Sequence, residues 1–290
     1  MMNRSFDTHI IREEQSLDGI WDFVPDGSER IYKMPVPGCW EQHPDFTCYQ
    51  GRGLYSRTIN VKKQSHIRFE FKGVSHTAEV FFDGKKIGCH YNAYTPFSII
   101  VKDITEGEHK LEVAVDNSFN ENSALHIPND YYTYGGIIRP VTMEYVGDLY
   151  IRYIHFTPEF KQEKWSGRTE VAVVNLSDEK LTTELKTVLD GVTNKATVEI
   201  AGKSEQICSF VNVYENAIPW SCDNPRLYLI KAEIEGDDLI ERVGFRMVTT
   251  DESRIYINGS PVFFKGVIAT KIMEQWDVLY LLNLWLLTLI

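Results

Sequence analysis

The segments His66-Ile-Arg-Phe-Glu-Phe71 and Glu79-Val-Phe-Phe-Asp-Gly-Lys-Lys-Ile-Gly88 decide the fold class of this 290-residue chain. In the first segment, apolar and polar residues alternate, which is the period of a β-strand with one buried face. In the second, Asp83-Gly84 supplies the positive φ angles that a tight type I′ turn requires, so we predict a hairpin. No stretch nearby shows a sustained helical period with caps. We therefore predict an antiparallel β-sandwich.

The same alternation extends in both directions along the chain. Further strands are predicted at Ser16–Val24, Lys110–Val115, Leu149–Phe156, Thr169–Val174, Lys195–Ile200 and Leu227–Ile234. The strands after Leu149 extend over roughly 100 residues, which fits an immunoglobulin-like sandwich, and we place the boundary around Val146-Gly-Asp148. A third unit begins with a predicted hairpin through Asn258-Gly259, leading into a buried strand.

Composition excludes several function classes. The net charge of −11, without a Lys/Arg cluster, argues against binding to nucleic acid or to a membrane surface. The aromatic fraction of 12% suits carbohydrate binding, where sugar faces stack on rings, but it suits the cores of β-sandwiches equally well. No Gly-rich phosphate loop or metal-ligand cluster is present, so we expect no cofactor and no metal.

Cysteine usage and the ends of the chain indicate a reducing cytoplasm. The five cysteines are odd in number, widely spaced and without a Cys-x-x-Cys pair, which argues against a disulfide framework or a zinc site. The first residues lack the apolar core and small-residue cleavage site of a secretory signal. The apolar run Val278–Ile290 is shorter than the roughly 20 residues of a spanning helix, so we expect no membrane anchor.

An ordered set of short motifs resembles the N-terminal part of the family 2 glycoside hydrolases, the group that contains β-galactosidases and β-glucuronidases. The matching segments are Leu17–Trp21, Val36–Trp40, Gly53–Arg57, Gly73–Val80, Asp83-Gly84, Tyr94–Phe97, Val115–Asn117, Asp130–Pro140, Trp220-Ser221, Pro225–Tyr228, Val243–Arg246, Ile257–Gly259 and Lys265–Val267. Each motif is weak alone, but their order and spacing over most of the chain carry the resemblance.

The resemblance implies an all-β architecture with a domain order. A jelly-roll, galactose-binding-like domain of the sugar-binding type is expected at residues 1–147, and an immunoglobulin-like β-sandwich at 148–250. Residues 251–267 would supply only the first strand of a (β/α)8 barrel, and 268–290 form an apolar tail without family character. In the family, the barrel supplies two catalytic glutamates. We therefore assign no catalytic residue to this chain and interpret Asn120-Glu121 as a solvated loop.

One loop of the first domain has an implied role in a complete enzyme. In the family, the loop ending in Gly-Ile-x-Arg reaches over the barrel mouth, and its Asp, Asp130 here, contacts sugar hydroxyls. A carboxylate can accept two such hydrogen bonds; the alternative is that Asp130 caps its own Tyr-rich loop. Arg139 is expected to brace the loop by pairing with a carboxylate. Tyr131 is expected to support the loop, and Trp40 to be a structural ring rather than a sugar platform.

The family pattern stops after Val267. Family members continue with Asn-Arg-His-Glu-Asp or a close variant, whereas here Ile268-Ala-Thr-Lys follows. Inserting one adenine after the Val267 codon yields a frame that begins with Asn and permits Arg, His, Glu and Asp in succession. We hypothesise a one-base deletion at this point; a sequencing error and a genuinely different end are the alternatives. We also expect the two sandwiches to fold without Ser253–Ile290.

The sequence thus predicts an N-terminal fragment of a retaining β-galactosidase or β-glucuronidase, inactive alone, with a β-glycoside as the partner of the parent enzyme. The choice between galactoside and glucuronide stays open, as do the linkage and a homo-oligomer. Two other functions remain as alternatives. A stand-alone carbohydrate-binding module would bind glycans without the barrel, and a structural or assembly module would associate without glycan affinity.

Overall fold

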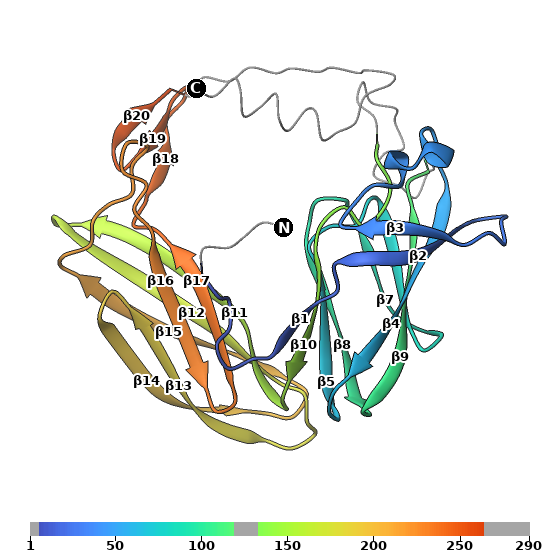
Figure 1. Ribbon diagram of the computed structural model, residues 1–290. Coiled ribbons are helices and arrows are strands. Elements are labelled where there is room, and N and C mark those ends of the chain that lie inside the picture. The colour runs from blue at the N-terminus through green and yellow to red at the C-terminus, as the bar shows by residue number, and fades with distance from the viewer. Residues whose placement is uncertain (1–5, 119–132, 264–290) are drawn as a thin grey trace. The chain divides into compact units, whose positions relative to one another are not determined.

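The computed structural model describes residues 6–118 and 133–263 and is built almost entirely of β-strands (Figure 1). This confirms the predicted all-β fold. The described chain forms two compact units. We call the unit around residues 15–144 the first sandwich, and the unit that combines residues 6–14 with 145–263 the second sandwich.

The first sandwich contains a six-stranded and a four-stranded sheet. The six-stranded sheet has the order β3-β2-β4-β9-β6-β7, and the four-stranded sheet has the order β1-β10-β5-β8. The strands are β1 (Glu14–Ser16), β2 (Gly19–Pro25), β3 (Tyr32–Val36), β4 (Arg52–Val61), β5 (Ser65–Phe71), β6 (Thr77–Phe82), β7 (Lys85–Tyr91), β8 (Phe97–Ile104), β9 (Gly107–Asp116) and β10 (Val141–Val146). Two short 3-10 helices, η1 (Trp40–Gln42) and η2 (Pro44–Phe46), follow β3.

The two segments from which the fold was predicted, 66–71 and 79–88, form the expected strand and hairpin. In β5, Ile67, Phe69 and Phe71 are completely buried, because alternate side chains of a strand point to the same face. Between β6 and β7, Asp83 and Gly84 have φ angles of 48° and 75°, as the predicted hairpin turn requires.

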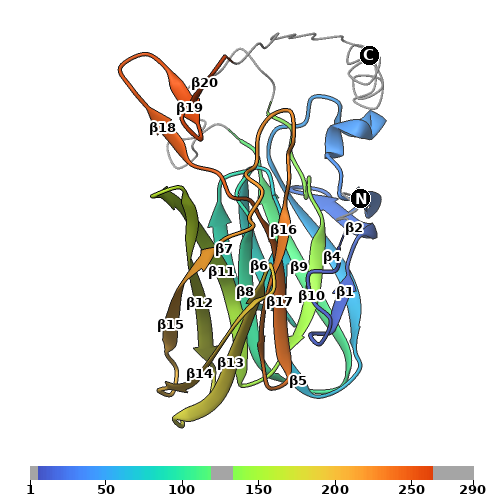
Figure 2. The same cartoon turned by 90° about the vertical axis from the view of Figure 1, so that its left-hand side faces the viewer.

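The second sandwich pairs a three-stranded sheet, β11-β12-β15, with a four-stranded sheet, β14-β13-β16-β17 (Figure 2). The strands are β11 (Leu149–Lys161), β12 (Lys164–Asn175), β13 (Leu181–Leu189), β14 (Val192–Ile200), β15 (Glu205–Tyr214), β16 (Tyr228–Ile234) and β17 (Asp237–Val243). Branched aliphatic side chains from both sheets form one core cluster, and a second cluster surrounds the completely buried Phe245.

Residues 6–14 group with the second sandwich, and the predicted domain bounds of 1–147 and 148–250 stay predictions. Two buried carboxylates explain this placement, because buried charges need donors. Arg12 contacts Asp237 through Nε at 2.7 Å and Nη2 at 2.8 Å. Asp238 accepts the backbone N–H of Ile10 at 3.0 Å and of Ile11 at 2.8 Å.

A small three-stranded sheet follows: β18 (Val248–Thr250), β19 (Ile255–Ile257) and β20 (Ser260–Val262). The predicted Asn258-Gly259 hairpin joins β19 to β20, with φ angles of 51° and 79°. The strand predicted to be buried is not buried over its described part, since Phe263 is 84% exposed. The reason is that β20 is an edge strand, paired only with β19 in the described chain.

All five cysteines are free thiols in the structure. Within the described residues, we find no helix with the length and apolar character needed to cross a membrane.

Candidate functional site

The loop singled out by the sequence follows β9, and the structure describes only its ends. Asp130 and Tyr131 lie outside the described residues, as do Asn120-Glu121 and the tail beyond residue 263. Their predicted roles therefore stay predictions. The described end of the loop, residues 133–139, lies in the first sandwich, and its anchoring defines the candidate site.

Asn117, directly after β9, connects the two ends of the loop. Its side chain is buried, with 1% exposed. The Oδ1 atom accepts the N–H of Gly51 at 2.9 Å, and Nδ2 donates to the carbonyl of Thr133 at 3.1 Å and to Glu41 Oε1 at 3.3 Å. The Asn117 amide thus uses both its acceptor and its donors, and it connects the end of β9 with Thr133, where the described chain resumes after the loop.

Glu41, on η1, holds the returning chain by its carboxylate. The N–H of Gly135 donates to Oε1 at 2.9 Å and to Oε2 at 3.1 Å. Burial raises the pKa of Glu41 to about 7, although the Gly135 N–H favours the charged form and opposes the shift. A raised carboxyl pKa can mark a catalytic acid. Here both oxygens are occupied by backbone N–H, which indicates an anchoring role.

Two glycines allow the returning chain to pass close to the aromatic core. A Cβ on Gly135 would lie 2.0 Å from Cζ2 of Trp40, so any other residue would collide with the indole. Gly136 has a φ of 127°, a conformation that favours glycine. Its N–H and carbonyl exchange hydrogen bonds with Ser75 at 3.0 and 2.8 Å. The backbone at 135–136 is therefore fixed on both sides.

Trp40 is completely buried, which confirms that its ring is structural. Its centroid lies 5.5 Å from that of Phe23 and 6.5 Å from the stacked ring of Tyr55, and Nε1 donates to the carbonyl of Tyr49 at 3.2 Å. Burial raises the pKa of Tyr55, whose hydroxyl has no hydrogen-bond partner among the described residues. The loop end rests on this rigid aromatic group.

Arg139 lies at the end of the loop and contacts Tyr94. Its Nη1 donates to the carbonyl of Tyr94 at 3.0 Å, and its guanidinium carbon lies 5.9 Å from the Tyr94 ring centroid. Its backbone N–H donates to the carbonyl of Gly73 at 3.2 Å. Within the described part of the chain the guanidinium thus contacts a carbonyl and a ring, and its predicted pairing with a carboxylate stays a prediction. A guanidinium has several donors and an aromatic-stacking face, so it can use both.

The sequence did not single out Glu41 or Asn117 as site residues. Glu41 directly follows the motif Val36–Trp40, and Asn117 is the last residue of the motif Val115–Asn117, both of which were used for the family resemblance. The signal that could have found them is the Gly135-Gly136 pair, because adjacent glycines indicate a close backbone approach that needs polar partners.

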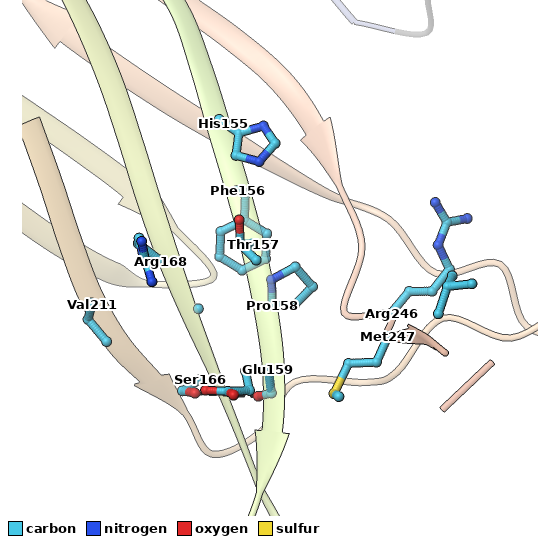
Figure 3. Close-up of a pocket in the computed structure, with 12 residues that line it drawn as sticks. His155, Phe156, Thr157, Pro158, Glu159, Ser166, Arg168, Val211, Arg246 and Met247 are labelled. Atoms are coloured by element: carbon cyan, nitrogen blue, oxygen red, sulfur yellow. Dashed lines mark hydrogen bonds between the residues drawn. The ribbon is translucent and has the colours of Figure 1, made fainter. Parts of the chain in front are cut away.

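The second sandwich has an open pocket of about 520 Å³ (Figure 3). Its lining comes from three neighbouring strands and the segment after β17: His155, Phe156, Thr157, Pro158, Glu159, Ser166, Gly167, Arg168, Val211, Arg246, Met247 and Val248. Glu159 is the single carboxylate of this lining, so the pocket lacks the carboxyl pair that glycoside hydrolysis uses. The guanidinium carbon of Arg246 lies 4.9 Å from the ring centroid of Trp220. The lining therefore does not fit glycoside hydrolysis by a carboxyl pair.

Comparison with known proteins links both sandwiches to one family. Residues 29–146 match the model described as "Glycosyl hydrolases family 2, sugar binding domain", and residues 149–246 match the model "Glycosyl hydrolases family 2". A putative β-glucuronidase of Formosa agariphila is 29% identical over 217 residues, which are 71% of this chain and 26% of that protein. A β-galactosidase of Thermoanaerobacter pseudethanolicus is 27% identical over 222 residues, 71% of this chain and 29% of that protein.

Among solved structures, a GH2 β-galacturonidase from Eisenbergiella tayi bound to galacturonate is 43% identical, with a TM-score of 0.84. The match covers 89% of this chain and 47% of that chain. A β-glucuronidase of Bacteroides uniformis, 21% identical with a TM-score of 0.78, shares the fold. The chain thus spans less than half the length of these relatives.

Proposed function

The chain belongs to glycosyl hydrolase family 2, and from this premise we propose that it supplies the non-catalytic β-sandwiches of a retaining β-glycosidase. We further propose that the glycosidase removes terminal β-linked uronic acids, of which galacturonic acid is the best supported. The observation that carries this proposal is the 43% identity to the β-galacturonidase from Eisenbergiella tayi. The identity is 29% to the putative β-glucuronidase and 27% to the β-galactosidase.

The described residues fit a supporting role in that reaction. Retaining hydrolysis needs an acid/base carboxyl and a nucleophilic carboxylate, about 5–5.5 Å apart, on either side of the glycosidic bond. Glu41, the described carboxyl with a raised pKa, holds the Gly135 N–H instead. Together with Asn117, it fixes the loop end that, by family resemblance, carries the sugar-contacting Asp130. Support of this kind matters because reacting groups must be held within fractions of an ångström.

A domain exchange tests whether these sandwiches can support the hydrolysis of a β-galacturonide. Residues 1–246 of this chain would replace the corresponding domains of the Eisenbergiella tayi β-galacturonidase, with the chromogenic p-nitrophenyl β-galacturonide as substrate. The chimera is expected to keep kcat/KM within about tenfold of the parent, a loss of no more than about 1.4 kcal/mol in transition-state stabilisation.

A matched control exchange uses the corresponding domains of the Thermoanaerobacter pseudethanolicus β-galactosidase and is expected to lose far more activity. A chimera that folds with the parent's melting cooperativity but does not hydrolyse the galacturonide would contradict the proposal that these sandwiches support hydrolysis of a β-galacturonide. The chain alone is expected to release no p-nitrophenol from galacturonide, glucuronide or galactoside, and turnover by the chain alone would contradict the supporting role.

A further inference from the structure

Strand β15 forms an open edge of the second sandwich. It is the last strand in the order β11-β12-β15 and pairs with β12 alone in the described chain (Figure 2). The register runs from Trp165↔Tyr214 to Val174↔Glu205 without a bulge. One row of backbone N–H and C=O groups of β15 therefore points away from the sheet, along ten residues.

The register identifies which residues present these groups. The N–H of Asn175 donates to the carbonyl of Ser204 at 2.9 Å, so Ser204 is bonded toward β12. Along an antiparallel strand, the backbone N–H and C=O groups of alternate residues point to opposite sides. The backbone groups of Cys208 and Phe210 therefore also bond to β12. Those of Ile207, Ser209, Val211 and Val213 point away from the sheet. In agreement, the carbonyl of Ile207 accepts the side-chain amide of its neighbour Gln206 at 3.0 Å.

The same outward-bonding residues also present apolar side chains to solvent. Ile207 is 47% exposed, Val211 is 71% exposed and Val213 is 52% exposed. The segment from Gln206 to Tyr214 contains no charged residue and no proline. A long, regular, apolar edge of this kind is a template for pairing with another strand.

The other edges of the second sandwich carry the protection that β15 lacks. Strand β11 contains Pro158 and a register shift after Ile151. Strand β14 exposes Lys195, which pairs with Glu184 of β13, and Glu199, which pairs with Lys180 directly before β13. In β17, the N–H of Ile240 donates to the carbonyl of Thr8 at 2.8 Å, so the N-terminal segment covers part of that edge. Charges, proline, bulges and covering segments are the usual protections of sheet edges.

We propose that β15 is a homodimer interface, at which a second copy of this chain pairs its own β15 antiparallel across a two-fold axis. Identical strands are self-complementary in this arrangement. With Ser209 opposite itself, Ile207 faces the partner's Val211, so apolar residues meet on one face. In the same register, Lys203, which precedes β15, lies opposite the partner's Glu215, which follows β15. Opposite charges therefore meet at each end of the paired strands. If the register between the two copies moved by two residues, Glu205 would instead lie opposite the partner's Glu215, and two like charges would meet.

The expected dimer is weak and concentration-dependent. A single pair of edge strands buries less area than the roughly 1,200–2,000 Å² of standard stable interfaces. The dimer should therefore form in the micromolar range. Sedimentation velocity of the full chain over that range measures the dissociation constant directly.

Two variants and a matched control test the interface. Val211→Lys places a charge on the open edge, and Ser209→Pro removes an outward N–H while leaving the bonds to β12 in place. Thr197→Lys makes the charge change of the first variant on the exposed edge of β14. We expect the wild type and Thr197→Lys to dimerise equally, and each β15 variant to weaken dimerisation by about tenfold or more.

Two results would overturn the proposal. One is a wild-type chain that stays monomeric at all concentrations. The other is a dimer that persists unchanged in a folded β15 variant, which would place the association on another surface such as the apolar tail. Circular dichroism establishes folding of both variants, and Ser209→Pro carries the test alone where Val211→Lys does not fold.

Discussion

Each of the two sandwiches uses a carboxylate to hold a distant chain segment, but the partners of the two carboxylates differ. In the first sandwich, Glu41 accepts the neutral N–H of Gly135 and the amide of Asn117. In the second, Asp237 faces the guanidinium of Arg12 at 2.7 Å, with both side chains 2% exposed. The comparison teaches that removing the cation from a buried ion pair such as Arg12–Asp237 leaves an uncompensated charge and so destabilises the fold strongly. A carboxyl held by neutral donors, such as Glu41, can instead bind a proton near neutral pH.

Breaking the charged anchor should have the largest effect. Arg12→Ala would leave Asp237, 1% exposed, as a buried charge without its cation. We expect the free energy of unfolding to fall by about 3–5 kcal/mol, as measured by urea denaturation. The matched control is Lys180→Ala, which removes the exposed ion pair with Glu199 and should change the free energy of unfolding far less. Equal effects of the two substitutions would show that Arg12–Asp237 is not an anchor.

Filling the close approach beside Glu41 should have the next largest effect. In Gly135→Ala, the new Cβ would meet the indole of the buried Trp40 at 2.0 Å, and overpacking of this kind costs about 1–3 kcal/mol. Gly147→Ala is the control, because its nearest contact would be an ordinary 3.5 Å and its φ is not positive. Thermal denaturation followed by tryptophan fluorescence distinguishes the two. A melting temperature unchanged by Gly135→Ala would contradict the described packing.

The neutral anchor predicts a pH dependence of stability. Burial raises the pKa of Glu41 from 4.5 to about 7 in the folded state, so folding favours the protonated form. This contribution is fully present below about pH 4.5 and is lost as the pH rises through about 7. Glu41→Gln removes the titrating group, and should flatten this part of the curve of unfolding free energy against pH. A curve identical to that of the wild type would assign the dependence to other groups.

The smallest effect is expected at the end of the loop. Arg139→Ala removes the hydrogen bond to the Tyr94 carbonyl, and we expect a loss of about 0.5–1.5 kcal/mol by urea denaturation. Arg139→Lys should recover only part of this, because an ammonium lacks the planar face that lies near the Tyr94 ring. If Arg139→Lys had the same free energy of unfolding as the wild type, the positive charge alone would account for the contribution of Arg139.

The strands and turns were predictable because they depend on neighbours in sequence. The alternation in β5 fixes which side chains are buried, and Asp83-Gly84 fixes its turn within a few residues. The family resemblance extended this to the order of the two sandwiches. These features need no knowledge of which distant segments meet.

The anchors were not predictable from local pattern because their partners are far apart in sequence. Glu41 meets Gly135 across 94 residues, and Arg12 meets Asp237 across 225. Nothing near Glu41 distinguishes it from a solvated acidic residue after Trp40. Among the described residues Arg139 contacts the carbonyl and ring of Tyr94, 45 residues away in sequence, and its predicted carboxylate partner stays a prediction.

The most direct test of the proposed function is to sequence the coding DNA across the Val267 codon and several hundred bases beyond it. The account predicts that a frame shifted by one base encodes a barrel with paired catalytic glutamates, so that these sandwiches support the hydrolysis of a β-uronide. A confirmed frame with nothing family-like in the following DNA would contradict it. Calorimetric titration of the chain with glycans would then test the carbohydrate-binding alternative.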